Sequence, residues 1–146
     1  MVDDGISARL ALLEQHVGDL RETQPRNFEM YRSDKMLRRY IERMLHMAID
    51  TCIQIGIGIL TQEGYRSPEN YHDVFIVLGE HGILPPALVD SMTALVEFRN
   101  VLVYEHAAVD DMMVYGLLKR RLEDFTAFAR TICEFIANSA SQDFPN

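Results

Sequence analysis

Two residues whose types suit proton transfer and anion binding occupy positions that a helix normally keeps apolar. An apolar stripe runs through Leu88, Leu95 and Leu102 at helical spacing, and two of its inward positions hold Arg99 and His106. At about 100° per residue, these two side chains would lie within about 20° of one face if the helix continues to His106. A buried unpaired charge is costly, so this stretch must face a wet cleft, a subunit interface or a carboxylate.

Arginine and histidine together suit metal-free phosphate chemistry. Arginine presents a permanently charged planar fork to a phosphate, and histidine titrates near neutral pH. In RNA cleavage a base takes the proton of the ribose 2′-hydroxyl, this oxygen attacks the adjacent phosphate, and a fixed cation stabilises the added negative charge. The alternative is a purely structural role. The pair would then form an ion-pair site at a dimer interface, or Arg99 would be neutralised by Glu97, Glu42 or Glu134.

Composition restricts where such chemistry is found. The chain has 146 residues, 48% hydrophobic and 25% charged, which is the balance of one globular domain spanning residues 1–146. Lysine and arginine number 14 against 22 acidic residues, for a formal charge of -8. Binding of nucleic acid over a broad basic surface is therefore not expected. A locally basic cleft remains compatible with this charge, because the local field is what acts there.

One local concentration of basic residues lies in the expected second helix. Arg38, Arg39 and Arg43 belong to a run that is either a solvated face or a basic wall for RNA phosphates or for an acidic partner. The histidines and cysteines outside the Arg99 to His106 segment lack the spacing of metal ligands, so no metal and no cofactor is expected.

Further features predict a cytoplasmic protein without membrane association. Cys52 and Cys133 lie in apolar helical patterns and are expected to be reduced core residues. Residues 1–5 are acidic rather than basic, and no apolar run is expected to reach the roughly 20 residues of a membrane span.

The elements that must position these residues are all helices. The periodicity predicts helices from 6 to 20, from about 27 to about 60, from 68 to about 81, from 85 toward 106, and from 111 to 136, with a frayed tail over 138–146. Strand patterns are nearly absent. The fold class expected is all-α, an up-and-down four-helix bundle with an additional short helix.

Local signals refine two of these elements. Ser67 and Pro68 predict an N-cap followed by proline in the first helical position, and Tyr71 is expected to point inward from this short helix. Gly56 and Gly58 lie within an apolar helix rather than after a strand, and therefore predict close helix crossings instead of a phosphate loop.

The segment from Arg99 to His106 resembles the signature of the HEPN superfamily. That signature is an arginine, usually with a polar neighbour such as Asn100, followed after four to six residues by a histidine. The segment Tyr65 to Leu84 is similar to the connector and short helix of the HepT-like branch, and the helical layout agrees over nearly the whole chain.

The resemblance implies an all-α homodimer whose two Arg and His motifs line a cleft at the subunit interface. Similar members are metal-independent endoribonuclease toxins, and their partner is an antitoxin with the minimal nucleotidyltransferase (MNT) fold that transfers AMP to a tyrosine of the motif. By match to the motif, Arg99 would bind phosphate, His106 would be the acid or base, and Asn100 would be a supporting polar group.

The motif departs from the commonest HepT-like form, which has histidine after four residues and tyrosine two later. Here Tyr104 occupies the histidine place and His106 the tyrosine place. Tyr104 is the tyrosine inside the motif and hence the candidate for AMP transfer, although it would point about 140° away from Arg99 on an ideal helix. Two other functions stay open: a non-catalytic helical partner or substrate-binding subunit of a nucleotidyltransferase, and a structural dimer without a ligand.

Overall fold

The computed structural model describes residues 4–142, and within this range every regular element is a helix. The elements are α1 (Asp4–Glu22), α2 (Phe28–Ser33), α3 (Lys35–Glu63), α4 (Tyr71–Glu80), α5 (Pro86–Tyr104), the 3-10 helix η1 (His106–Ala108), α6 (Asp111–Arg120) and α7 (Leu122–Gln142). The expected all-α fold class is confirmed.

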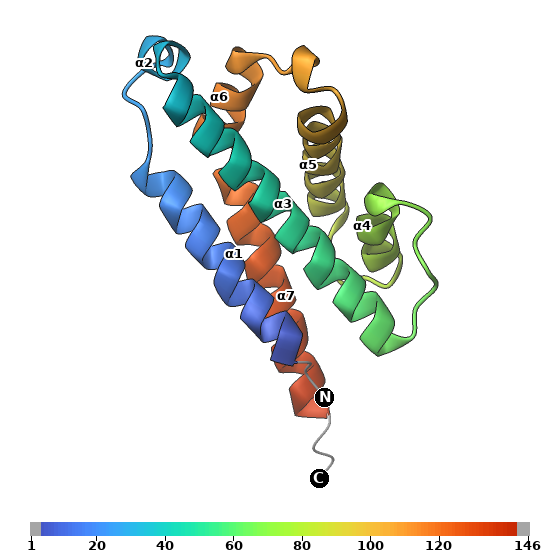
Figure 1. Cartoon of the computed structure of the whole chain (residues 1–146). Coiled ribbons are helices and arrows are strands. Elements are labelled where there is room, and N and C mark those ends of the chain that lie inside the picture. The colour runs from blue at the N-terminus through green and yellow to red at the C-terminus, as the bar shows by residue number, and fades with distance from the viewer. Residues whose placement is uncertain (1–3, 143–146) are drawn as a thin grey trace.

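Four long helices form the bundle, and α3 runs through its middle (Figure 1). It packs against α1, α4, α5 and α7, while α1 also packs against α7. The short helix α4 lies against α3 and α5 on the outside of the bundle. Helices α2 and α6 and the last turn of α5 gather at one end, so residues from both halves of the sequence meet there.

Two expected helices are each broken in two. Asp34 ends α2 and caps α3, where its side chain accepts a hydrogen bond from the backbone N–H of Leu37 at 3.1 Å. A carboxylate at this position satisfies an N–H group that the first turn of a helix leaves free, which favours a new start over a continuous helix. Arg121, the C-cap of α6, interrupts the last expected helix between α6 and α7.

The start of α4 also differs from the sequence expectation. Its N-cap is Asn70, whose side chain accepts from the backbone N–H of Asp73, so Ser67 and Pro68 lie in the preceding loop. Arg66 fixes that loop by binding both Asp73 and Glu80, at 2.7 Å and 2.8 Å. Because helix α4 starts later, Tyr71 falls in its first turn and is 39% exposed, so the inward placement expected for it is wrong.

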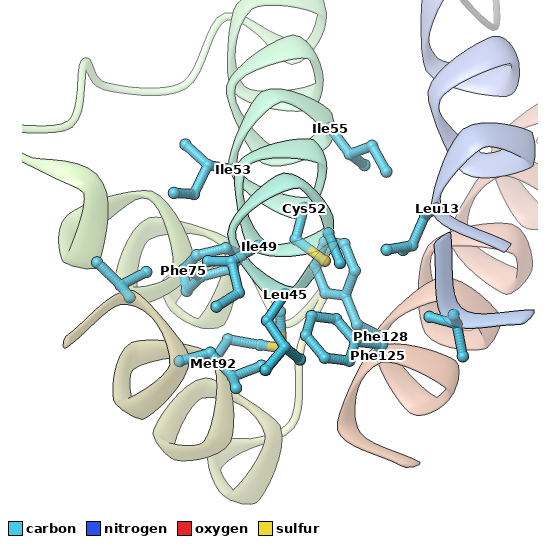
Figure 2. Packing of buried hydrophobic residues seen from close by; sticks show 14 of the residues in the cluster. Leu13, Leu45, Ile49, Cys52, Ile53, Ile55, Phe75, Met92, Phe125 and Phe128 are labelled. Carbon is cyan, nitrogen blue, oxygen red and sulfur yellow. The ribbon is translucent and has the colours of Figure 1, made fainter. Parts of the chain in front are cut away.

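The core lies where α1, α3, α4, α5 and α7 meet, as Figure 2 shows. Phe75 of α4 and Phe128 of α7 are fully buried and pack edge to face, with ring centroids 5.7 Å apart. Gly56 allows α4 to approach α3, since a Cβ atom there would meet the Val74 side chain at 2.5 Å. A Cβ atom at Gly58 would likewise meet the side chain of Ile6 of α1 at 3.3 Å. The close helix crossings expected at both glycines are therefore confirmed.

Three further expectations are corrected. Helix α3 is long and apolar enough to cross a membrane by length and composition alone, which the sequence reading missed, but most of its apolar stretch is buried inside the bundle. Cys52 is buried as expected, whereas Cys133 is exposed because it faces away from the stripe that ends at Ile132. Helix α7 continues to Gln142, so the frayed tail is wrong for 138–142, and 143–146 lie outside the described residues.

Candidate functional site

Helix α5 ends just before the second residue of the Arg and His pair. Its last residue is Tyr104, Glu105 follows as the C-cap, and His106 opens the separate 3-10 helix η1. The expectation that both side chains project from one continuous helix is therefore wrong. Arg99 is held on a rigid helix, and His106 is held on a single turn beyond its end.

Arg99 is buried and its charge is compensated inside one chain. Its side chain is 10% exposed, and its Nε donates to Asp50 of α3 at 2.8 Å. Its Nη1 donates to the Oδ1 of Asn100 at 3.2 Å, which makes Asn100 a direct neighbour of the guanidinium. The expected partners were Glu97, Glu42 or Glu134, and none of them binds it. Asp50 does so because it lies opposite the C-terminal part of α5, where Arg99 is found.

Two tyrosine rings lie beside the guanidinium. Its central carbon is 5.0 Å from the ring centre of Tyr71 and 5.9 Å from that of Tyr104. The Tyr104 side chain, which an ideal helix would direct away, reaches Arg99 because both side chains are long. Burial acts to lower the pKa of Arg99, but its interactions with Asp50 and Tyr104 outweigh burial and raise the pKa. The site therefore holds a permanent cation.

His106 has a different environment. Its side chain is 61% exposed, and its Nε2 lies 3.2 Å from the Oε1 of Glu42, a carboxylate that is itself only 14% exposed. A carboxylate at one ring nitrogen orients an imidazole, while the other nitrogen stays available. Glu42 thus positions the histidine at the open end of the site.

Helix α3 also supplies a histidine that the sequence reading passed over. The Nε2 of His46 lies 2.9 Å from the second oxygen of Asp50, so this carboxylate binds His46 and Arg99 together. Glu42, His46 and Asp50 follow one another at intervals of four residues, which puts them on one face of a helix. That interval was a signal in the sequence that could have found them.

The three arginines of the basic run are not brought to one place. Arg39 and Arg43 are exposed and line a pocket of about 170 Å³ together with Glu42, His46, Leu102 and His106. Arg38 instead binds the backbone carbonyl of Arg32 and lies 3.8 Å from Asp111 of α6, outside this pocket. Across residues 4–142, no three histidine, cysteine or acidic side chains are grouped so as to hold a metal ion.

The fold is that of a known class of helical nuclease. A sequence model of the family described as ribonuclease HepT-like matches residues 13–132, which is most of the chain. The chain belongs to the ribonuclease HepT-like family.

Individual relatives are consistent with this assignment. The chain is 26% identical over 132 residues to a tRNA nuclease HepT of Aphanizomenon flos-aquae, covering 90% of this chain and 89% of the relative. It is 24% identical over 102 residues to an mRNA nuclease HepT of Shewanella oneidensis, covering 70% and 77%. The solved structure of a tri-AMPylated HEPN toxin of Shewanella oneidensis in complex with its MNT antitoxin has the same fold, with a TM-score of 0.85, 21% identity, and 91% and 99% of the two chains covered.

Proposed function

We propose that this chain is a metal-independent endoribonuclease, the toxin of a toxin–antitoxin pair, and that it cuts RNA at the site formed by Arg99 and His106. The observation that carries the proposal is the pairing of a buried permanent cation with an exposed, carboxylate-bound histidine at one end of the bundle. These are the two groups that in-line attack by a ribose 2′-hydroxyl requires.

Each residue has a distinct role in this mechanism. Arg99 binds the phosphate that is attacked and stabilises its added negative charge, and His106 transfers a proton. Asn100 holds the Nη1 of Arg99 and so fixes the orientation of the guanidinium. Because Tyr104 is 73% exposed and Arg99 is buried, the phosphate approaches the guanidinium from the side of Tyr104.

The arginines near the pocket provide the local positive charge that the whole chain lacks. Arg39 and Arg43 line the pocket with exposed side chains and are placed to contact flanking RNA phosphates. Arg38, which is bound between α2 and α6, contributes at most a contact to RNA or to the partner at the edge of this surface.

The proposal includes the partners that the resemblance implies. The chain forms a homodimer in which the two sites share a cleft, and a cognate MNT nucleotidyltransferase antitoxin adds AMP to Tyr104. Apolar side chains of Val103 on α5 and of Met112 and Met113 on α6 are exposed, at 38%, 58% and 41%, and supply surface for such contacts. We place this pair in the cytoplasm, where its RNA substrate is made.

The proton-transfer role of His106 is tested by RNA cleavage in EDTA with the purified chain and no partner. We expect wild type to cut RNA and His106→Ala to be slower by about 10²- to 10⁴-fold, which is the usual contribution of general acid–base catalysis. The matched control is His81→Ala, a histidine stacked on Tyr65 away from the site, which keeps the wild-type rate. Cleavage by His106→Ala at the wild-type rate would contradict the role.

A dimeric wild-type chain that leaves several classes of RNA intact in this assay would favour the second function. Two observations favour this non-catalytic function: the order of Tyr104 and His106 is reversed, and Arg99 is buried. In that case the chain is a non-catalytic helical subunit that binds the nucleotidyltransferase or its substrate.

Modification of Tyr104 is tested by mass spectrometry after co-expression with the antitoxin. We expect the intact mass to rise in multiples of one adenylate, because the Tyr104 side chain is exposed enough for another enzyme to reach it. Tyr104→Phe removes the acceptor oxygen and abolishes the increase. Tyr71→Phe, whose ring also lies beside Arg99, is the control and keeps it. An unchanged wild-type mass beside an active antitoxin would rule the modification out.

A further inference from the structure

Two histidines, each bound to its own carboxylate, line one small pocket. His106 of η1 pairs with Glu42, and His46 of α3 pairs with Asp50, at 3.2 Å and 2.9 Å. Both rings belong to the pocket of about 170 Å³ that Arg39 and Arg43 also line. The proposed function uses only one of these two imidazoles.

Cleavage through a 2′-hydroxyl needs two proton transfers. One group must remove the proton from the 2′-oxygen as the 2′-oxygen–phosphorus bond forms, and another must give a proton to the 5′-oxygen as the phosphorus–5′-oxygen bond breaks. The attacking and leaving oxygens lie on opposite sides of the phosphorus, so a single imidazole is poorly placed to serve both. A second proton-transfer group, from the same chain or from the other protomer of the proposed dimer, removes this difficulty.

We propose that His46 is the second proton-transfer residue of the reaction, and that His46 and His106 divide the two transfers between them. One imidazole enters neutral and takes the 2′ proton, and the other enters protonated and gives its proton to the 5′-oxygen. The products are an RNA with a 2′,3′-cyclic phosphate and an RNA with a 5′-hydroxyl, so protons and charge balance without a co-reactant. This inference rests on the proposed function.

The environment of His46 suits the task. Its side chain is 25% exposed, which leaves the ring accessible, and Asp50 binds only its Nε2. Among the described residues, the Nδ1 of His46 and the Nδ1 of His106 make no hydrogen bond, so each ring keeps one nitrogen for substrate. In both histidines one ring nitrogen faces a carboxylate and the other is left for substrate. A reaction in which one histidine is the acid and the other is the base requires this arrangement.

Asp50 further connects His46 to the phosphate-binding group. Its Oδ1 accepts from the Nε of Arg99 and its Oδ2 faces His46, so one carboxylate fixes the distance between the cation and the imidazole. His72 is the useful contrast, because its Nε2 also pairs with a carboxylate, that of Glu97, at 2.9 Å, yet it does not line this pocket. A carboxylate-bound histidine is therefore not by itself evidence of the role; the shared pocket and the link to Arg99 are.

The test compares two substrates that differ in one atom. The first is an ordinary RNA, and the second has sulfur in place of the bridging 5′-oxygen at the cut site. A thiolate leaves without being protonated, so the second substrate does not need the general acid. We measure wild type, His46→Ala and His106→Ala on both, with His72→Ala as the matched control.

We expect His46→Ala to be slower than wild type on ordinary RNA by about 10²- to 10⁴-fold. On the sulfur substrate we expect one of the two histidine variants to recover most of the wild-type rate while the other stays slow, which also assigns acid and base. His72→Ala keeps the wild-type rate on both. His46→Gln, which retains an amide N–H for Asp50, controls for folding and is expected to be as slow as His46→Ala on ordinary RNA.

The outcomes separate this inference from the function on which it rests. Wild-type cleavage together with unimpaired His46→Ala or His46→Gln overturns the role of His46 and leaves the proposed function standing. A slow His46→Ala with recovery of both histidine variants, or of neither, on the sulfur substrate also overturns the division of transfers. An inactive wild type on both substrates overturns the proposed function, and the inference with it.

Discussion

We expect Arg99→Lys to cut RNA about 10²- to 10³-fold more slowly than wild type, the usual cost of removing a preorganised charge-stabilising donor. Lysine keeps the positive charge beside Asp50, so this carboxylate retains an ionic partner. It lacks the planar fork, however, and one ammonium group cannot bind Asp50, Asn100 and a phosphate with the geometry that arginine has. The loss is expected in kcat, since the added charge exists only in the transition state.

The matched control is Arg66→Lys. Arg66 also binds two groups, Asp73 and Glu80, but it lies on the loop before α4 and outside the site. Its replacement is expected to leave the cleavage rate unchanged. Circular dichroism and the free energy of unfolding show whether Arg99→Lys remains folded. If a folded Arg99→Lys cuts RNA within about threefold of wild type, the guanidinium does not contact the reacting phosphate.

The largest expected effect on stability is that of Phe128→Ala, which we expect to lower the free energy of unfolding by about 3–5 kcal/mol. Phe128 is fully buried and packs edge to face against Phe75, so truncation leaves a cavity between α7 and α4. The measurement is urea denaturation, and a change of this size is a large fraction of the 5–15 kcal/mol typical of a domain.

Phe135→Ala is the comparison for this second prediction. Phe135 lies on the same helix but is only partly buried, so its truncation removes fewer packing contacts. We expect Phe135→Ala to lower the free energy of unfolding clearly less than Phe128→Ala does. Equal losses for the two variants would mean that the core is not centred where Phe75 and Phe128 meet. Because α4 also carries Tyr71 to Arg99, loosening this contact is expected to affect the site as well as the fold.

The fold class and the Arg99 and His106 pair could be predicted because both depend on local periodicity. Apolar spacing predicts amphipathic helices, and a charged residue on an apolar stripe is visible without knowing its neighbours. The breaks at Asp34 and Arg121 were missed because a cap competes with a continuing helix by small free-energy differences. Whether residues 1–146 form one domain remains a prediction.

The residues of α3 that contact Arg99 and His106 could not be predicted in the same way. Asp50 is 49 residues from Arg99, and their contact depends on how α3 and α5 pack. The sequence offers Glu97, Glu42 and Glu134 as partners of Arg99, but Glu97 binds His72 and Glu42 binds His106. The one-sided spacing of Glu42, His46 and Asp50 was readable, although only the packing shows that this face of α3 meets the end of α5.

The end of α5 at Tyr104 makes the separation between the two motif residues adjustable. Inserting a residue between Arg99 and Tyr104 would rotate the helix beyond it by about 100° and move Tyr104 away from Arg99. An insertion between Tyr104 and His106 lengthens a short connection outside the helix and is absorbed there. The helix therefore fixes the position of Tyr104 relative to Arg99, whereas the position of His106 depends on the short connection after the helix.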